Sequence, residues 1–116
     1  MHPDAIPMVK LVALFKKPEN SEEFDSLFSR NVIPLLRQIP GLQRFEITNV
    51  TGAAFGESKF HLMAELYFSD RLALDTAMAS KQGKAVAKGL LQFATDVSSL
   101  FHGEVKDDPP VAQTAV

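Results

Sequence analysis

The segment at residues 58–68, SKFHLMAELYF, constrains the fold most, because apolar and polar side chains alternate along it. A period of two is typical of a β-strand that places one face on a hydrophobic core and the other face away from it. Phe60 and Leu62 belong to the core face, so His61 is expected to point to the opposite face. Hydrophobic residues make up 46% of the 116 residues, which is enough for the core of one domain.

Six elements are predicted, in the order strand, helix, strand, strand, helix, strand. They are a strand at 8–16, a helix that follows Asn20 and ends before Pro40, strands at 42–50 and 58–68, a helix from Ser69 to about Ala79 with a helical or broken continuation to Lys88, and a strand at 96–106. Pro34 predicts a kink or a local break in the first helix. The order β-α-β-β-α-β is that of a ferredoxin-like α+β fold, a four-stranded antiparallel sheet with helices on one face.

The domain boundaries follow from the two ends of this pattern. Residues 1–7 contain two prolines and predict a flexible N-terminal arm. Residues 8–106 form the predicted ferredoxin-like domain. Residues 107–116, DDPPVAQTAV, have adjacent prolines and no periodicity, and they predict a C-terminal tail.

The sheet face opposite the helices is predicted to be mixed, with apolar and charged side chains side by side. Its members are Val12, Leu14, Met63 and Tyr67, and among them Lys10, Arg44, Glu46, His61, Glu65, His102 and Glu104. A monomer would leave the apolar groups in water, whereas two sheets packed face to face would bury them, at about 25 cal/mol per Å². We therefore expect a two-fold homodimer that encloses a pocket lined by the polar residues of this face.

Four segments carry a resemblance to a known family: MVKLVALFKKPENSEEF, IPLLRQIPGLQRFEI, FHLMAELYFSD and LLQFATDVSSLF. Together they resemble the EthD family, which is named for the degradation of ethyl tert-butyl ether. The most specific part is Ile33-Pro34-Leu35 followed by Pro40-Gly41-Leu42, and the resemblance covers residues 8–106. It implies a dimeric α+β barrel, a fold shared with cofactor-free polyketide cyclases, muconolactone isomerases and small monooxygenases.

Two positions depart from the pattern of that family. The family usually reads His-x-Pro-Leu where this chain has Val32 followed by Ile33-Pro34-Leu35. It also usually has the Asp of a D-x-x-N-F segment where this chain has Gly89. The roles of the family's His and Asp therefore cannot be transferred to this chain.

The candidate ligand-binding residues are those predicted to line the pocket: Arg44, His61, Met63, Glu65, Tyr67 and His102. His61 and Glu65 are four residues apart on one strand, so both could line one cavity and exchange protons with a ligand. Tyr67 could donate to a developing enolate oxygen. The alternative is that these groups form cross-strand ion pairs with Lys10, Arg44 or Lys59 in the dimer interface. No catalytic residue is assigned.

Several classes of partner and site are not expected. The formal net charge is −2 and no dense Lys/Arg patch is present, which argues against nucleic acid. No stretch approaches the roughly 20 apolar residues of a membrane span. The absence of cysteine excludes thiolate sites, and the spacing of His2, His61 and His102 supports no metal site, so no metal or cofactor is expected. The start of the sequence shows no signal peptide, and a cytoplasmic location is expected.

Two functions remain open at this point. The chain could bind a small hydrophobic organic molecule in a barrel pocket, as a cofactor-free isomerase or cyclase or as an accessory to the oxidative degradation of xenobiotics such as ethers. Alternatively, it could be a non-enzymatic binding or accessory protein, because Val32 and Gly89 stand at the positions of the family's usual His and Asp.

Overall fold

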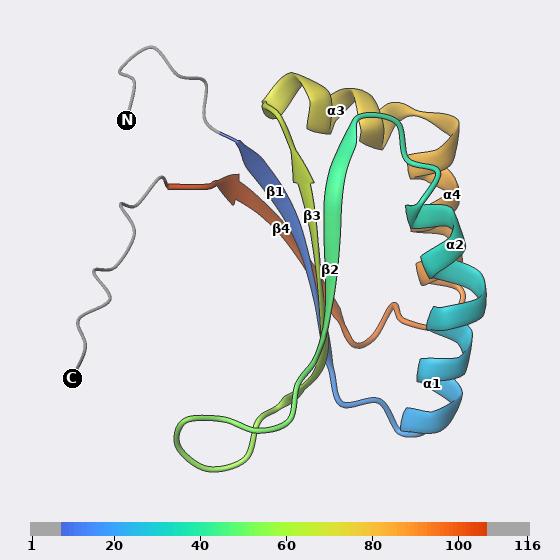
Figure 1. Cartoon of the computed structure of the whole chain (residues 1–116). Helices are drawn as coiled ribbons and strands as arrows, with labels where there is room; N and C mark the ends of the chain where they lie inside the picture. The colour runs from blue at the N-terminus through green and yellow to red at the C-terminus, as the bar shows by residue number, and fades with distance from the viewer. Residues whose placement is uncertain (1–7, 107–116) are drawn as a thin grey trace, which may run out of the picture.

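The computed structural model describes residues 8–106 (Figure 1). Its elements are β1 (Val9–Lys16), α1 (Ser21–Leu27), the π-helical segment η1 (Phe28–Val32), α2 (Ile33–Leu36), β2 (Leu42–Asn49), β3 (Phe60–Phe68), α3 (Arg71–Ala79), α4 (Lys81–Leu91) and β4 (Ser98–Glu104). The N-terminal arm and the C-terminal tail predicted from the sequence lie outside the described residues.

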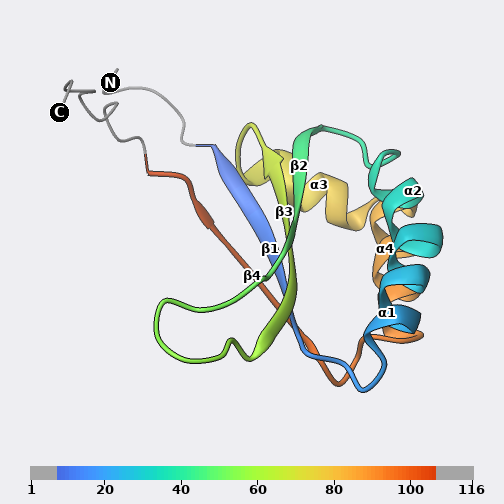
Figure 2. The ribbon, with the colours of Figure 1, turned by 60° about the horizontal axis from the view of Figure 1, so that its bottom comes forward.

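The strands form one antiparallel sheet in the order β2-β3-β1-β4. All helices of residues 8–106 lie on one side of this sheet, and both views show its other side free of helices (Figures 1 and 2). This is the predicted ferredoxin-like α+β fold, with two strands in the middle and β2 and β4 at the edges. We call the side without helices the open face.

The hydrophobic core fills the space between the sheet and the helices. Along β1 the core side chains recur every second residue, and Ala13 and Phe15 lie opposite Ala64 and Leu62 of β3. Phe15 is completely buried, and its ring meets the ring of Phe24 edge-on at 5.4 Å between centroids. Full burial of a side chain of this size contributes about 1.5–3 kcal/mol, so this aromatic contact anchors α1 to the sheet.

The first helical region begins as the sequence predicts and then widens. The Asn20 side chain caps α1 by accepting a hydrogen bond from the backbone N–H of Glu23 at 3.0 Å. Before Pro34 the helix changes to π geometry, and the N–H of Ile33 donates to the carbonyl of Phe28, five residues back. The expected irregularity at Pro34 is therefore a π-turn, which accommodates a proline that has no N–H to donate.

The second helical region consists of two helices that meet at Ser80. Asp70, rather than the expected Ser69, caps α3 by accepting from the N–H of Ala73 at 2.8 Å. Ser80 ends α3 with extended backbone, and its hydroxyl caps α4 by accepting from the N–H of Gly83 at 3.0 Å. The break expected from Ser80 and Gly83 therefore separates two complete helices, and α4 continues to Leu91 rather than ending at Lys88.

Candidate functional site

Tyr67 is the centre of a polar cluster on the open face. Strand pairing places Lys10 of β1 on one side of Tyr67 and Arg44 of β2 on the other. The Tyr67 hydroxyl donates to Glu46 Oε1 at 3.1 Å, and the Arg44 guanidinium lies over the Tyr67 ring at 3.9 Å from its centroid. Lys10 Nζ donates to Glu65 Oε2 at 2.6 Å. Two cations and two carboxylates thus surround one nearly buried phenol.

The contacts in this cluster favour the protonated forms of Lys10 and Tyr67. The hydrogen bond to Glu65 raises the pKa of Lys10 above its ordinary value. Burial raises the pKa of Tyr67, and the hydrogen bond to Glu46 adds to the effect. Tyr67 is therefore a neutral donor at physiological pH. The Lys10–Glu65 ion pair joins β1 to β3, as in the ion-pair alternative, whereas Arg44 pairs with Glu46 on its own strand.

Four of the six candidate residues lie together on the open face. Arg44, Glu65 and Tyr67 belong to the cluster, and Met63 is on the same face opposite Leu14. Their predicted role in ligand binding remains a prediction.

The expected orientation of His61 is wrong. His61 Nε2 lies 2.7 Å from Asp25 Oδ1 of α1, and the imidazole packs edge-on against Phe24 at 5.5 Å, on the helix side of the sheet. The cause is a β-bulge: Leu62 pairs with Phe15 but Phe60 pairs with Lys16, so one residue of β3 is left without a partner. The bulge reverses the alternation from His61 backwards, and Phe60 is absent from the core that it was predicted to join.

The face assigned to His102 is also wrong. His102 of β4 pairs with Leu11, whose side chain packs against the core beneath the helices, so His102 lies on the helix side. Leu100 and Glu104 share that side, and Phe101 is on the open face instead. The reason is that β4 is an edge strand exposed along almost its whole length, so the sequence carries no alternation from which to read its phase.

An apolar cavity of about 40 Å³ lies between the sheet and the helices. Its lining residues all carry apolar side chains: Leu11, Ala13, Phe15, Phe28, Val32, Leu36, Ala64, Leu66, Val86, Leu90 and Leu100. Val32 is the last residue of the π-helical segment and is 1% exposed. Leu100 lies at the β4 edge and is 58% exposed, so this side chain marks the open end of the cavity.

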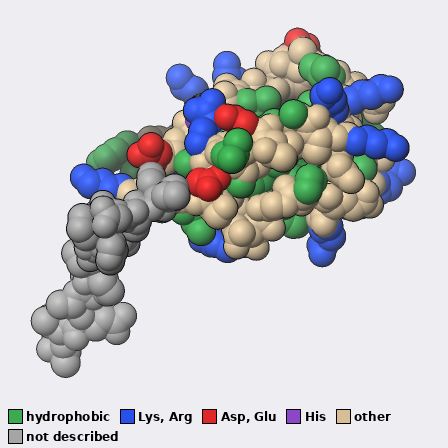
Figure 3. Space-filling view, turned by 90° about the horizontal axis from the view of Figure 1, so that it is seen from above, with side chains coloured by type: hydrophobic (Ala, Val, Ile, Leu, Met, Phe, Trp, Pro, Cys, Tyr) green, Lys and Arg blue, Asp and Glu red, His purple; other side chains and the backbone are tan. Residues whose placement is uncertain are grey.

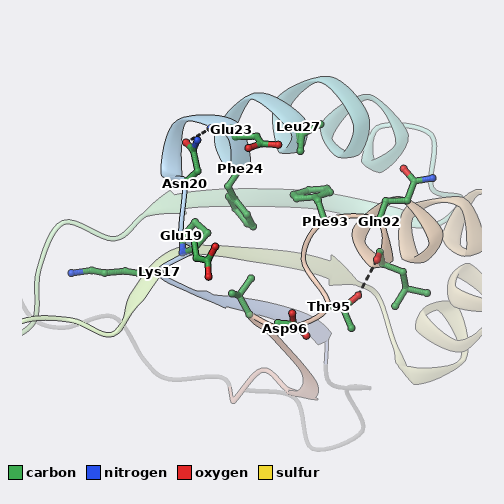
Figure 4. Close-up of a pocket in the computed structure, with 13 residues that line it drawn as sticks. Lys17, Glu19, Asn20, Glu23, Phe24, Leu27, Gln92, Phe93, Thr95 and Asp96 are labelled. Carbon is green, nitrogen blue, oxygen red and sulfur yellow. Dashed lines mark hydrogen bonds between the residues drawn. The ribbon is translucent and has the colours of Figure 1, made fainter.

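A larger and more open pocket of about 720 Å³ lies between the start of α1 and the segment that joins α4 to β4. Figure 4 shows Phe24 and Phe93 projecting into the space between these two segments, and their centroids are 5.3 Å apart. Glu19, Glu23 and Asp96 supply carboxylates around it. Sequence reasoning missed this pocket because its two walls are about 70 positions apart in the chain and carry no shared motif.

The described residues show no other type of site. Within residues 8–106, no group of three or more His, Cys, Asp or Glu could hold a metal ion. No helix in that range is long and apolar enough to cross a membrane. Seen from above, the basic side chains are spread around the outline of the molecule rather than gathered in one patch (Figure 3).

Known proteins resemble this chain in both sequence and fold. The chain is 41% identical to an EthD family protein of Bacillus halodurans C-125, and the match covers 85% of this chain and 99% of that one, with a TM-score of 0.83. It is 28% identical over 98 residues to an uncharacterized 11.0 kDa protein from the thcB–thcC intergenic region of Rhodococcus erythropolis, covering 84% of this chain and 95% of that protein. No family model matches the sequence.

Two further crystal structures share the fold at lower identity. A dimeric ferredoxin-like protein of unknown function from Jannaschia sp. CCS1 is 17% identical with a TM-score of 0.66, and the match covers 84% of this chain and 99% of that one. SnoaB, a cofactor-independent oxygenase from Streptomyces nogalater, is 19% identical with a TM-score of 0.61, over 92% of this chain and 99% of that one. At these identities the likeness concerns the fold alone.

Proposed function

The chain belongs to the EthD family, and from this premise we propose that it binds a small hydrophobic organic molecule in the cavity between its sheet and its helices. The observation that carries the proposal is the uniformly apolar lining of this cavity. Binding of an apolar ligand to such a wall is favoured by about 25 cal/mol for each Å² of apolar surface removed from water. A polar ligand would find no hydrogen-bond partner there.

The cavity must widen to admit a ligand, because about 40 Å³ is far below the volume of an organic molecule. Leu100 and Leu90 are the side chains best placed to move. Leu100 is 58% exposed on an edge strand, and Leu90 is only partly buried, so rotating either one outward disrupts little packing. The ligand would therefore enter at the β4 edge and displace these two leucines.

The proposed role is binding or an accessory role rather than acid–base catalysis by the family's usual pair. Val32 forms part of the cavity wall and cannot transfer a proton. Gly89 has no side chain, and a Cβ at this position would lie 3.7 Å from the carbonyl oxygen of Asn31, on the side of α4 that faces the first helical region. Both positions where the resemblance implies chemistry thus face inward but carry no polar side chain.

Cofactor-free catalysis is a second candidate, and the position of His102 favours it. His102 lies opposite Leu11, which lines the cavity, and two residues along β4 from Leu100. A ligand that enters past Leu100 would therefore pass close to an imidazole, a group that can act as a general base. Replacing His102 with Gln would abolish turnover but leave binding intact if this candidate is correct.

We also propose that the molecule is a homodimer formed through the open face. That face carries the apolar side chains of Val12, Leu14, Met63 and Phe101. Lys10 and Arg44 already pair with Glu65 and Glu46, so burying these four groups against a second copy leaves none of them without a partner. The fold is shared with a protein described as dimeric.

The ligand proposal is tested by thermal unfolding with three probes: ethyl tert-butyl ether, toluene and phenol. We expect at least one probe to raise the unfolding midpoint of the wild-type protein, and the rise should continue with the logarithm of the free probe concentration above the dissociation constant. Ala64→Val adds two methyl groups to the cavity wall and should weaken that probe at least tenfold. Ala79→Val, the same change at an exposed position of α3, should leave its affinity unchanged.

Two results would contradict the proposal. One is that no probe shifts the midpoint up to its solubility limit. The other is equal binding to the wild type and to Ala64→Val, which would assign the ligand to the larger pocket beside Phe24 and Phe93.

A further inference from the structure

The loop at residues 50–59 is unusually long and apolar for a connection between adjacent antiparallel strands. Most such hairpins use two to five residues, whereas this loop joins Asn49 to Phe60 with ten. Its sequence, VTGAAFGESK, has no charged residue before Glu57. At its centre Phe55 is 95% exposed, the highest exposure among the large hydrophobic side chains of the described residues. Burying this aromatic side chain against another surface would remove a large apolar area from water.

The local backbone presents Phe55 outward. Phe55 follows two alanines and precedes Gly56, whose φ of +74° turns the chain directly after it. A Cβ added to Gly52 or Gly56 would meet nothing within 4 Å, so no other part of the described chain packs against these positions. Phe55 is therefore an aromatic side chain held on a free-standing turn.

The loop bends toward the open face. Figures 1 and 2, seen from directions 60° apart, both show it curving away from the helices and projecting beyond the sheet on the open side. The bulge at His61 explains the bend, because an extra residue in one strand kinks that strand and increases its twist. The last ladder hydrogen bond before the loop, from Val50 N–H to the His61 carbonyl at 2.9 Å, lies at this bulge.

We propose that the 50–59 loop is an arm that packs against a second copy of this chain, with Phe55 buried in the contact. This inference rests on the homodimer proposed above and adds a contact outside the paired sheet faces. The occupant is a second copy because the arm projects on the side where the open face presents Phe101, itself 52% exposed. In a two-fold dimer each arm reaches the other subunit, so every effect at Phe55 counts twice.

The test uses Phe55→Trp, because the chain has no other tryptophan. Emission and light scattering are measured over the same dilution series. We expect the emission to shift to the blue, and its intensity to become resistant to acrylamide, as the mass rises from one chain to two. Leu72→Trp is the matched control: Leu72 is 74% exposed on α3, on the helix side, and its emission should stay at the solvent-exposed position at every concentration.

A second pair of variants measures the energetic contribution of the contact. Phe55→Ser should raise the dimer dissociation constant at least tenfold, and Leu72→Ser should leave it within a factor of two. A doubled mass with Phe55→Trp still solvent-exposed would overturn the arm and leave the dimer standing. A mass of one chain at all concentrations would overturn both the dimer and the arm.

Discussion

Tyr67 shows how one residue can link strand pairing to electrostatics. It is the only tyrosine in the chain, it is 7% exposed, and its hydroxyl bonds to Glu46 while Arg44 covers its ring. A buried phenol near two carboxylates holds its proton more tightly than a phenol in water, which is why its pKa is raised.

The raised pKa of Tyr67 predicts a loss of stability at alkaline pH. Above the ordinary value of 10.0, the unfolded chain releases the phenolic proton while the folded chain keeps it. The contribution is therefore complete below that pH and is lost as the pH rises through the folded pKa. Urea unfolding from about pH 8 to about pH 11 should show a steeper decline in the wild type than in Tyr67→Phe.

Lys10 contributes with the same sign, because its pKa is also raised. The main cause, its hydrogen bond to Glu65, is present in both proteins, whereas the smaller contribution of Tyr67 is lost in Tyr67→Phe and adds to the expected difference. Absorbance of the tyrosinate in the folded protein provides an independent reading, since there is one tyrosine to titrate. Parallel pH profiles for the two proteins would contradict the prediction.

At the scale of elements, the contact between α3 and α4 depends on a glycine. A Cβ at Gly83 would lie 2.2 Å from the carbonyl oxygen of Ala77, the residue whose carbonyl also accepts a hydrogen bond from the N–H of Ser80. The sharp turn at Ser80 brings the end of α3 onto the first turn of α4, and only a residue without a side chain fits there.

Two alanine substitutions in α4 should therefore have opposite effects. Gly83→Ala forces backbone apart and should lower the free energy of unfolding by about 2 kcal/mol or more. Gly89→Ala meets its nearest neighbour at an ordinary 3.7 Å and should raise the free energy of unfolding by up to about 1 kcal/mol, the usual gain in a helix interior. Urea denaturation of both variants measures the difference, and equal effects would disprove the close approach.

At the scale of the whole molecule, the open face is the feature that bears on whether the chain is a monomer or a dimer. Within residues 8–106 the helices cover one side of the sheet only, so no helix lies above Val12, Leu14 and Phe101 (Figure 2). Val12 is 5% exposed, whereas Phe101 is 52% exposed. A sheet with one apolar side uncovered is stable in water only if another surface covers it or if its polar side chains shield it. The Tyr67 cluster shields its own region, and Phe101 lies outside the cluster.

The dimer is tested by placing a charge at Phe101. Wild-type protein at micromolar concentration should scatter light as two copies of the 12.7 kDa chain. Phe101→Asp should shift the mass toward one copy, because it buries a carboxylate without a partner between the sheets. Leu72→Asp puts the same charge on an exposed helix position and should leave the mass unchanged. A wild type that stays at 12.7 kDa would exclude the dimer.

Sequence alone determined the order of the elements, the cap at Asn20 and the core face of β3 from Leu62 to Phe68, because periodicity, capping and turn chemistry are local properties. The family resemblance, carried by short motifs, was also readable, and the identity with the Bacillus protein confirms it.

Tertiary structure decided the positions of His61 and His102. A bulge is visible only when two strands are paired, since the partner residue that fails to appear is on another strand. Which side chains of β4 face the helices could be read only from the pairing of β4 with β1, because an exposed edge strand has no buried face to mark its register. The cavity lined by Val32 likewise depends on distances between segments far apart in the chain, and no local pattern encodes those distances.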